Sequence, residues 1–346
     1  MSGGVDSSVS AYLLKEEGYD VFGIMLRLWT QTNDMVNRCC SPSAVNDARE
    51  IADILDIPFY VLDYNDFFKT QIVDQFTNSY LKGVTPNPCV YCNKKVRFGR
   101  LMDEAIKLGA DYLATGHYVR REELPDNTFR ILRGIDPQKD QSYMLYRLDQ
   151  RQISHALFPV GSYKKDKIRE IARQANLPVF AKGDSQDLCF FDSEGLKGFL
   201  GRQAPLSLKP GDIVLNNGTV VGQHQGLPLY TVGQRRGLNI PWSEPLFVLG
   251  KNSEKNELIV GAKNETGSKE FTVKDIHFSK SKITPDMIIQ TQTRYRGDTA
   301  TSRLTMIDAD RGKVTFDEPI NSPTPGQSAV FYQQDTVIGG AIIDLN

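Results

Sequence analysis

The chain has 346 residues, with 41 basic and 42 acidic side chains and a formal net charge of −1 at pH 7. One hydrophobic core seldom serves so long a chain, so we expect two or three domains. No apolar run reaches the ~18 residues that a membrane span needs, and no signal peptide precedes the first motif, which favours a cytoplasmic protein with no membrane partner. Because the charge is balanced, a polyanion must be bound by local basic clusters.

The chain opens with a motif typical of phosphate-binding loops at the head of a helix, SGGVDSS at residues 2–8. Gly3 and Gly4 let the backbone approach an anion without a Cβ in the way, and the serine hydroxyls add donors beside free helix amides. Asp6 faces the triphosphate with a negative charge, so it is either a Mg²⁺ ligand or a cap on the helix amides. The motif favours ATP and Mg²⁺ as cofactors, with conversion of ATP to AMP. The expected ATP-binding residues of this loop are Ser2, Gly3, Gly4, Val5, Asp6, Ser7 and Ser8.

A change of hydrophobic period divides the chain near residue 200. Before it, helical and strand patterns alternate: a helix from Ser7 to Gly18, a strand at 21–28, a helix at 45–55, a strand at 59–62, a helix at 94–108 and a strand at 112–115. This alternation predicts an α/β domain with a Rossmann-like parallel sheet, whose ligands lie beyond the carboxyl ends of the strands.

After Pro205 the pattern turns to short strands and turns. Asn217-Gly218 between two apolar runs is a hairpin signal, and strands are expected at 246–249 and 257–260. From about Lys269, six strands predict a small closed β-barrel; they lie at 271–278, 291–296, 301–307, 313–316, 328–332 and 337–343. The predicted domains are an α/β domain at 1–202, a central β-rich domain at 203–268 and a C-terminal β-barrel at 269–346.

A phosphate loop of this type normally follows a β-strand, yet the sequence starts at the loop. Either the natural start lies upstream or the chain is truncated. We expect the former, because loss of a central strand would expose the edges of its neighbours.

The five cysteines are too few and too odd in number for a disulfide scaffold in a chain this long, which leaves reactive or metal-bound thiols. Two of them, Cys89 and Cys92, lie in the string TPNPCVYCNKK at 85–95. The prolines predict an extended segment before a helix that begins near Lys94, and a helix N-terminus with neighbouring lysines favours a Cys92 thiolate. A buried thiol pair or half of a zinc site are the alternatives, although no second ligand pair follows at zinc spacing.

The remaining cysteines differ in setting. Cys189 follows an acidic, polar stretch and is flanked by apolar residues, a pattern that alone is more typical of a core residue than of a catalyst. Cys39 and Cys40 are adjacent, so they cannot easily bind one metal ion, and we interpret them as structural.

Eight strings, in order over nearly the whole chain, resemble the tRNA-specific 2-thiouridylases. They lie at residues 2–8, 85–95, 114–118, 139–143, 157–161, 184–190, 233–238 and 324–331. The resemblance implies an adenine nucleotide alpha hydrolase-like catalytic domain and a C-terminal barrel that binds tRNA. It implies an enzyme that adenylates the C2 oxygen of the wobble uridine, position 34, and then installs sulfur there, with release of AMP and pyrophosphate. Adenylation suits this chemistry, because it turns a poor leaving group into a good one.

The resemblance also implies roles for individual residues. Cys189 carries the incoming persulfide and Cys92 is the nucleophile, and the two close a disulfide as sulfur is released, which a reductant must reopen. Adenosine contacts are implied at Leu26, where the family usually has methionine, and at Gly116. The implied tRNA contacts are Asn87, Pro88, Cys89, His117, Lys139, Asp140, Gln141, Arg294, Tyr295 and Gln327. The implied partners are the anticodon arm of tRNA and a sulfur donor or relay protein, and we expect a monomer.

Cys89 departs from the family, which usually has an aspartate there, thought to act as general acid or base. Two interpretations remain open. Cys89 is a thiol acid or base, or Cys89, Cys92 and Cys189 together hold a [4Fe-4S] cluster, as in iron–sulfur-dependent tRNA thiolases. Two other functions also remain open: a different ATP pyrophosphatase, which would share the loop without needing the thiols, and a non-catalytic RNA-binding protein.

Overall fold

The computed structural model describes residues 1–29, 42–183, 188–279 and 287–344. None of the helices in these ranges is long and apolar enough to cross a membrane. The chain forms two compact units, which are described separately. The first comprises residues 1–73, 89–195 and 335–338, and the second comprises residues 74–88, 196–334 and 339–346.

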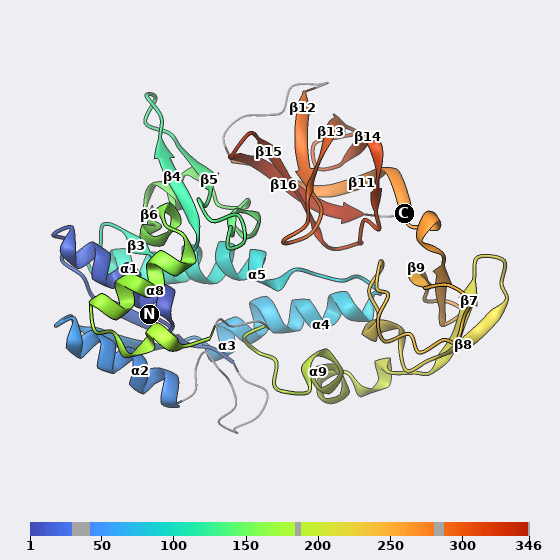
Figure 1. Ribbon diagram of the computed structural model, residues 1–346, viewed down its shortest axis with the longest axis horizontal. Helices are drawn as coiled ribbons and strands as arrows, with labels where there is room; N and C mark the ends of the chain where they lie inside the picture. The colour runs from blue at the N-terminus through green and yellow to red at the C-terminus, as the bar shows by residue number, and fades with distance from the viewer. Residues whose placement is uncertain (30–41, 184–187, 280–286, 345–346) are drawn as a thin grey trace. The chain divides into compact units, whose positions relative to one another are not determined.

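The first unit has the predicted alternation of helices and strands (Figure 1). Its N-terminal half contains α1 (Val5–Glu16), β1 (Gly23–Arg27), α2 (Pro42–Ile54), β2 (Phe59–Asp63), α3 (Asn65–Phe68) and the π-helix η1 (Lys69–Val73). Its second half contains α5 (Pro88–Tyr91), the π-helix η2 (Cys92–Leu101), α6 (Met102–Lys107), β3 (Leu113–Ala114), β4 (Val119–Glu123), β5 (Phe129–Arg133), η3 (Ser142–Met144), α7 (Gln150–Ser154), β6 (Ala156–Leu157), η4 (Pro159–Ser162), α8 (Lys165–Gln174) and η5 (Pro178–Ala181).

The strands of this unit confirm the parallel pairing, although not as one sheet. β1 pairs parallel with β2, and β3 pairs parallel with β6, so the described parallel strands of this unit form two separate pairs. The core lies against α1, where Val9 contacts an apolar cluster that includes Ile51 of α2 and Ile168 of α8. Gly18, with φ +86°, follows the end of α1 as predicted, because glycine adopts this left-handed conformation without strain.

The antiparallel hairpin of β4 and β5 was not predicted from the sequence. A turn signal was present, since Pro125, Asp126 and Asn127 separate two strand-like runs, and Asn127 adopts φ +60°. The outer edge of β5 is paired as well: Thr336 and Val337, from the far end of the chain, pair antiparallel with it.

The second unit is mainly β-structure (Figure 1; α4 in light blue, the other elements from yellow-green to red). Its elements are α4 (Asp74–Leu81), α9 (Gly195–Gln203), η6 (Pro205–Ser207), β7 (Gly211–Leu215), β8 (Val220–His224), η7 (Leu227–Leu229), β9 (Phe247–Asn252), β10 (Glu257–Gly261), η8 (Lys263–Glu265), β11 (Gly267–Phe278), β12 (Ile288–Gln292), β13 (Thr299–Met306), β14 (Gly312–Asn321), β15 (Ser328–Gln333) and β16 (Thr336–Asp344).

These strands confirm the predicted hairpin and barrel. β7 and β8 pair antiparallel around Asn217-Gly218, in a four-stranded sheet of order β8-β7-β10-β9. The six C-terminal strands pair in the order β11-β14-β13-β12-β15-β16, and β11 pairs again with β16, so the barrel closes. The prediction for β12 was wrong by several residues, because the chain turns at Arg294, whose carbonyl accepts a hydrogen bond from the Gly297 amide.

Lys251 of the second unit is unusual because the charged end of its side chain is buried. It lies on β9 opposite Leu258, a fully buried residue of the apolar core. Its Nζ is buried and has no hydrogen-bond partner among the described residues. Burial lowers the pKa of Lys251 from 10.5 to about 8. Since an unpaired buried ammonium is costly, this residue destabilises the folded chain at neutral pH.

We expect Lys251→Met to raise the free energy of unfolding at pH 7 by about 1–3 kcal/mol. Between the folded pKa of about 8 and the ordinary value of 10.5, the unfolded wild-type chain binds a proton that the folded chain lacks. Wild-type stability therefore rises with pH across this window, and the gain from the substitution should shrink. Urea denaturation of both proteins at pH 7 and pH 9.5 measures this difference, with Lys255→Met, an exposed residue of the same hairpin, as control. An equal gain at both pH values would contradict it.

Candidate active site

The phosphate loop leads directly into α1. Gly4 is the extended residue that precedes the helix, and its carbonyl accepts hydrogen bonds from Ser7 Oγ at 3.1 Å and Ser8 Oγ at 2.8 Å. Gly3 has φ +66°, and a Cβ on it would lie 2.7 Å from the Ala44 carbonyl oxygen of α2. The loop is therefore tightly packed and has glycine where only glycine fits, at the amide end of a 12-residue helix that can bind a phosphate group.

Asp6 is held by two side chains from distant parts of the sequence. Its Oδ1 accepts a hydrogen bond from Tyr118 Oη at 2.6 Å and forms an ion pair with Lys165 Nζ at 2.7 Å. Its carboxylate bonds these groups and no helix amide, so the helix-cap interpretation was wrong. One carboxylate beside a phosphate loop fits Mg²⁺, which takes most of its ligands from phosphate oxygens and water.

The loop after β3 packs against the phosphate loop at Gly116. A Cβ on Gly116 would lie 2.8 Å from the backbone carbon of Asp6 and 2.9 Å from the Ser7 nitrogen. The structure thus brings Gly116 to the phosphate loop. Leu26 lies on β1, paired with Leu62 of β2. The adenosine contacts expected at Leu26 and Gly116 stay predictions.

Two lysines of this site were missed by the sequence analysis. Lys165 is buried, with 7% of its surface exposed. Lys182 Nζ donates to the Gly3 carbonyl at 2.8 Å and pairs with Asp47 Oδ2 at 2.7 Å. The sequence held a signal for Lys165, because it stands three and seven residues before Ile168 and Ala172, on the apolar face of α8. It held no comparable signal for Lys182.

The thiol helix begins earlier than predicted. α5 starts at Pro88 and runs without a break into η2, so the expectation of an extended segment and a helix start near Lys94 was wrong. Proline suits the first position of a helix, because its missing N–H is one that needs no intrahelical partner. Cys89 therefore lies in the first turn and Cys92 one turn later.

Cys92 is buried and Cys89 is half-buried. Desolvation, with a smaller effect of the neighbouring Cys92, raises the pKa of the Cys89 thiol to about 11, although the Arg97 charge acts in the opposite direction. Cys92 is 8% exposed. Lys94 Nζ bonds Asp149 and Gln152, and Lys95 Nζ bonds Gln71, so neither ammonium group pairs with the Cys92 thiol.

The [4Fe-4S] interpretation finds no support in the part of the chain that the structure describes. Cys89, Cys92 and Cys189 are all described, and they do not come together as a metal-binding group. The expected disulfide between Cys92 and Cys189 is not formed in this structure. Cys39 and Cys40, and residues 184–187 of the Cys189 string, lie outside the described residues.

His117 lies in the loop between β3 and β4, and it contacts Arg97 of the thiol helix. Its Nδ1 is 2.8 Å from Thr115 Oγ1 and its Nε2 is 3.4 Å from Arg97 Nη1. A guanidinium can only donate, so Nε2 accepts and the ring proton is on Nδ1, facing Thr115. Burial, together with the Arg97 charge, lowers the pKa of His117 to about 3. His117 is therefore neutral at physiological pH and orients Arg97. Its expected contact with tRNA stays a prediction.

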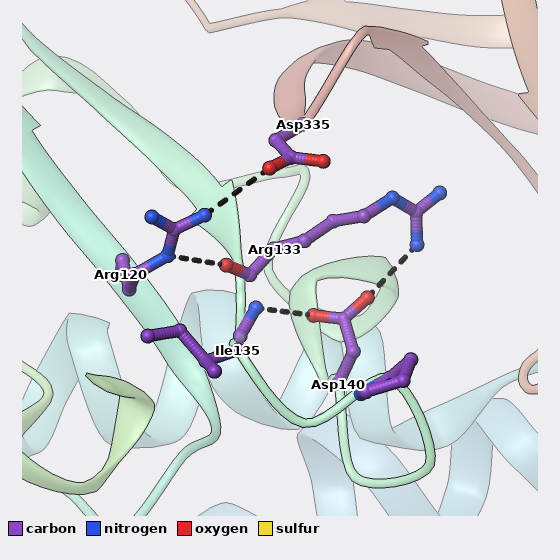
Figure 2. A pocket seen from close by; sticks show the side chains of 7 residues that line it. Arg120, Arg133, Ile135, Asp140 and Asp335 are labelled. Atoms are coloured by element: carbon purple, nitrogen blue, oxygen red, sulfur yellow. Dashed lines mark hydrogen bonds and ion pairs between the residues drawn. The ribbon is translucent and has the colours of Figure 1, made fainter. Parts of the chain in front are cut away.

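Asp140 organises the loop that follows β5 (Figure 2). Its carboxylate accepts hydrogen bonds from the Gly134 amide at 2.9 Å, from the Ser142 amide and hydroxyl, and from Arg133 Nη1 at 2.9 Å. The loop lines a cavity of about 380 Å³ with Arg120, which pairs with Asp335. Asp140 thus shapes the loop that contains Lys139 and Gln141, while the tRNA contacts expected at all three stay predictions.

The remaining predicted tRNA residues lie in the second unit. Gln327 Nε2 donates to the Thr85 carbonyl at 2.9 Å, which brings Gln327 to the segment that contains Asn87 and Pro88. Arg294 Nη2 donates to the carbonyls of residues 321 and 322, and Tyr295 stacks with its neighbour Arg296. None of these contacts tests the expected binding of tRNA.

We expect Gly3→Ala to weaken ATP binding at least tenfold and to cost about 1–3 kcal/mol of stability. The substitution adds strain at φ +66° and a clash with the Ala44 carbonyl. Calorimetric titration with a non-hydrolysable ATP analogue and thermal denaturation measure the two effects. Gly18→Ala is the matched control, since Gly18 has φ +86° at the other end of α1 but open space around its Cβ position. It should lose stability and keep ATP affinity; equal loss of affinity in both variants would contradict the assignment.

We expect Cys89 to react slowly with iodoacetamide at pH 7.5, at least ~30-fold more slowly than a peptide thiol, because only the thiolate reacts. The rate should rise about tenfold per pH unit up to pH 10, since the pKa of Cys89 is about 11. In Cys92→Ser this profile should shift to lower pH, because the Cys92 charge is lost. Peptide mass spectrometry gives the rates. A plateau reached by pH 9 would contradict the raised pKa.

Comparison with known proteins agrees with this arrangement. Three family models cover the chain: a "tRNA methyl transferase HUP domain" at 1–193, a "tRNA methyl transferase PRC-barrel domain" at 197–262 and an "Aminomethyltransferase beta-barrel domain" at 268–343. A Clostridium perfringens protein named "tRNA-specific 2-thiouridylase MnmA" is 44% identical over 99% of the chain and 97% of its own length. "tRNA-specific 2-thiouridylase MnmA 2" of a Thermoanaerobacter species is 44% identical over 99% and 96%, and the Moorella thermoacetica "tRNA-specific 2-thiouridylase MnmA" is 42% identical over 99% and 98%. The chain therefore belongs to the tRNA-specific 2-thiouridylase family.

Proposed function

We propose that this protein uses ATP to replace the C2 oxygen of the wobble uridine, position 34, of tRNA by sulfur, with release of AMP and pyrophosphate. The observation that carries the proposal is the presence, in one compact unit, of a phosphate loop and a helix with two thiols, the half-buried Cys89 and the buried Cys92. Family membership supports the same reaction. We assign the chemistry to residues 1–202 and tRNA binding to the C-terminal β-barrel at residues 269–346, with residues 203–268 as a central β-rich domain.

The phosphate loop performs the first half-reaction. The uridine C2 oxygen attacks the α-phosphorus of ATP, and the bond to the β-phosphate breaks. Free amides of α1 stabilise the departing pyrophosphate, with Ser7 and Ser8 as further donors. Mg²⁺, when bound, neutralises phosphate charge, and Asp6 is the residue that would hold it. Gly116 and Leu26 contact the adenosine. Lys165 adds a buried positive charge beside Asp6.

The thiols perform the second half-reaction. The terminal sulfur of a Cys189 persulfide attacks C2 of the adenylated uridine, and AMP leaves with the C2 oxygen. The Cys92 thiolate then attacks the Cys189 sulfur, the sulfur–sulfur bond to the base breaks, and its electron pair remains on the new 2-thiouridine. The products are 2-thiouridine and a Cys92–Cys189 disulfide, which a two-electron reductant reopens. The persulfide itself comes from a sulfur donor or relay protein.

Cys89 has the properties of a proton donor in this sequence. With a pKa of about 11 it keeps its proton at neutral pH, so it fits a general acid better than a general base. Its place in the first turn of the thiol helix puts it beside Cys92. We propose that the tRNA contacts at Asn87 and Pro88 hold the flipped target base there, since a base within the anticodon stack cannot reach buried thiols.

The thiols also separate this function from its alternatives. Another ATP pyrophosphatase would share the phosphate loop without needing Cys92 or Cys189. A non-catalytic RNA-binding protein needs neither. Methyl transfer, which two of the matched family models name, does not use a persulfide carrier. A compact unit with both the loop and the thiols favours sulfur transfer over all three.

The test is nucleoside mass spectrometry of unmodified tRNA incubated anaerobically with the protein, Mg²⁺-ATP and a persulfide donor. We expect ATP-dependent 2-thiouridine, a loss of at least ~100-fold in Cys92→Ser and in Cys189→Ser, and full activity in the control Cys40→Ser. Cys89→Asp should remain active and Cys89→Ala should not, because only the former keeps a titratable group. Thiol variants with undiminished activity would favour another pyrophosphatase, and tRNA binding without AMP formation would favour the non-catalytic alternative.

A further inference from the structure

The helix that contains Cys92 has an irregular backbone. η2 is a π-helix of ten residues, whereas π-helices are usually single turns that occur at functional sites. Gly99 breaks its geometry with φ −94° and ψ −105°. A Cβ on Gly99 would lie 2.9 Å from the Lys94 carbonyl oxygen, so the backbone of the two turns comes unusually close at this point. Such a helix needs hydrogen-bond partners from outside itself.

Gln152 of α7 supplies those partners. Its side-chain amide Nε2 donates to the Lys94 carbonyl at 2.9 Å and to the Phe98 carbonyl at 2.7 Å, and so spans one turn of η2. Its Oε1 accepts a hydrogen bond from Lys94 Nζ at 2.9 Å. Gln152 is 5% exposed, and its bond to the Phe98 carbonyl is fully buried. One side chain thus contacts both backbone and side chain of the helix that follows Cys92.

The orientation of Gln152 is itself fixed by a capping box. Asp149 precedes α7, and its Oδ1 accepts a hydrogen bond from the Gln152 amide at 2.9 Å. The Asp149 amide donates to Gln152 Oε1 at 3.3 Å, and Asp149 Oδ2 pairs with Lys94 Nζ at 2.6 Å. Capping boxes usually complete only their own helix. Here the same two side chains also fasten a second helix.

We propose that Gln152 is a positioning residue for the Cys92 thiol. By bridging the Lys94 and Phe98 carbonyls it sets the path of η2, and thereby the place of Cys92 at the start of that helix. The inference rests on the proposed function, in which Cys92 is the nucleophile. A nucleophile must lie within a few tenths of an ångström of its attack geometry, and a misplacement of about 1 Å can cost ~100-fold in rate.

The chain offers a matched control on the same helix. Gln150 makes the same kind of contact with a different element: its Oε1 accepts from the Phe129 amide at 2.8 Å and its Nε2 donates to the Phe129 carbonyl at 2.9 Å. Gln150→Leu therefore removes two backbone hydrogen bonds that tie α7 to β5 and leaves those to η2 in place. A purely structural role for Gln152 predicts equivalent effects from both substitutions.

The experiment compares Gln152→Leu, Gln152→Glu and Gln150→Leu for melting temperature, for the rate of Cys92 alkylation and for the kinetic constants kcat and KM with which tRNA is thiolated. We expect a fall in kcat of at least 30-fold in both Gln152 variants, with KM for ATP and tRNA changed less than threefold. Gln152→Glu should lose activity as well, because the glutamate keeps the acceptor for Lys94 Nζ but cannot donate hydrogen bonds to the Lys94 and Phe98 carbonyls. Gln150→Leu should lower the melting temperature as much as Gln152→Leu does, but it should keep kcat within threefold of the wild-type value.

Alkylation of Cys92 by iodoacetamide, read by peptide mass spectrometry, tests the inference without the enzymatic reaction. We expect at least a fivefold change in Gln152→Leu and none in Gln150→Leu. Equal falls in kcat for the two Leu variants, or Cys92 alkylation at the wild-type rate in Gln152→Leu, would overturn the proposal. If the wild type forms no 2-thiouridine, the proposed function fails. The alkylation rates alone then decide whether Gln152 positions the Cys92 thiol. If Gln152→Leu does not fold, Gln152→Asn, whose amide is one methylene too short, takes its place.

Discussion

The ion pair between Asp6 and the buried Lys165 is the interaction on which the phosphate site depends. It joins the start of α1 to the first turn of α8, and Tyr118 adds a hydrogen bond from the loop after β3. An unpaired buried ammonium is costly, so loss of Asp6 would leave the charge of Lys165 uncompensated in the interior. Because α1 and α8 also share one apolar core, the loop that meets ATP is fixed by segments from both halves of the first unit.

The electrostatic environment of the thiols differs from that of the phosphate loop. Burial keeps Cys89 protonated and His117 uncharged at neutral pH, and the lysines next to Cys92 in the sequence are paired with other side chains. The groups around the thiols therefore have fixed protonation states. Such surroundings suit a reaction in which a persulfide, a thiol and an adenylated base must exchange sulfur without competing hydrolysis, since water is excluded where polar groups are buried and satisfied.

A structural feature could be predicted from the sequence when the residues that determine it lie close together in the chain. The glycine loop at the head of α1, the Asn217-Gly218 hairpin and a six-stranded barrel each follow from adjacent residues, and the structure confirms them apart from the bounds of β12. The start of the thiol helix was misjudged because Pro88 was taken to end an extended segment, whereas it also suits the first position of a helix. Lys165 bonds Asp6, which lies 159 positions away in the sequence, and Gln152 bonds Lys94, which lies 58 positions away. No local sequence pattern encodes such pairs.

The segment that leads into the thiol helix is fixed in a comparable way within the second unit. Gln327 donates to the Thr85 carbonyl, and the Thr85 amide donates to the Pro325 carbonyl. Gly326 has φ +87°, and a Cβ on it would overlap a methyl group of Val84, so glycine is required for this approach. Asn87 and Pro88 follow at once, and Cys89 is the next residue along the chain. Two residues of the C-terminal barrel, Gly326 and Gln327, therefore fix the backbone of the segment at residues 84–85, which precedes the predicted tRNA contacts Asn87 and Pro88 in the sequence.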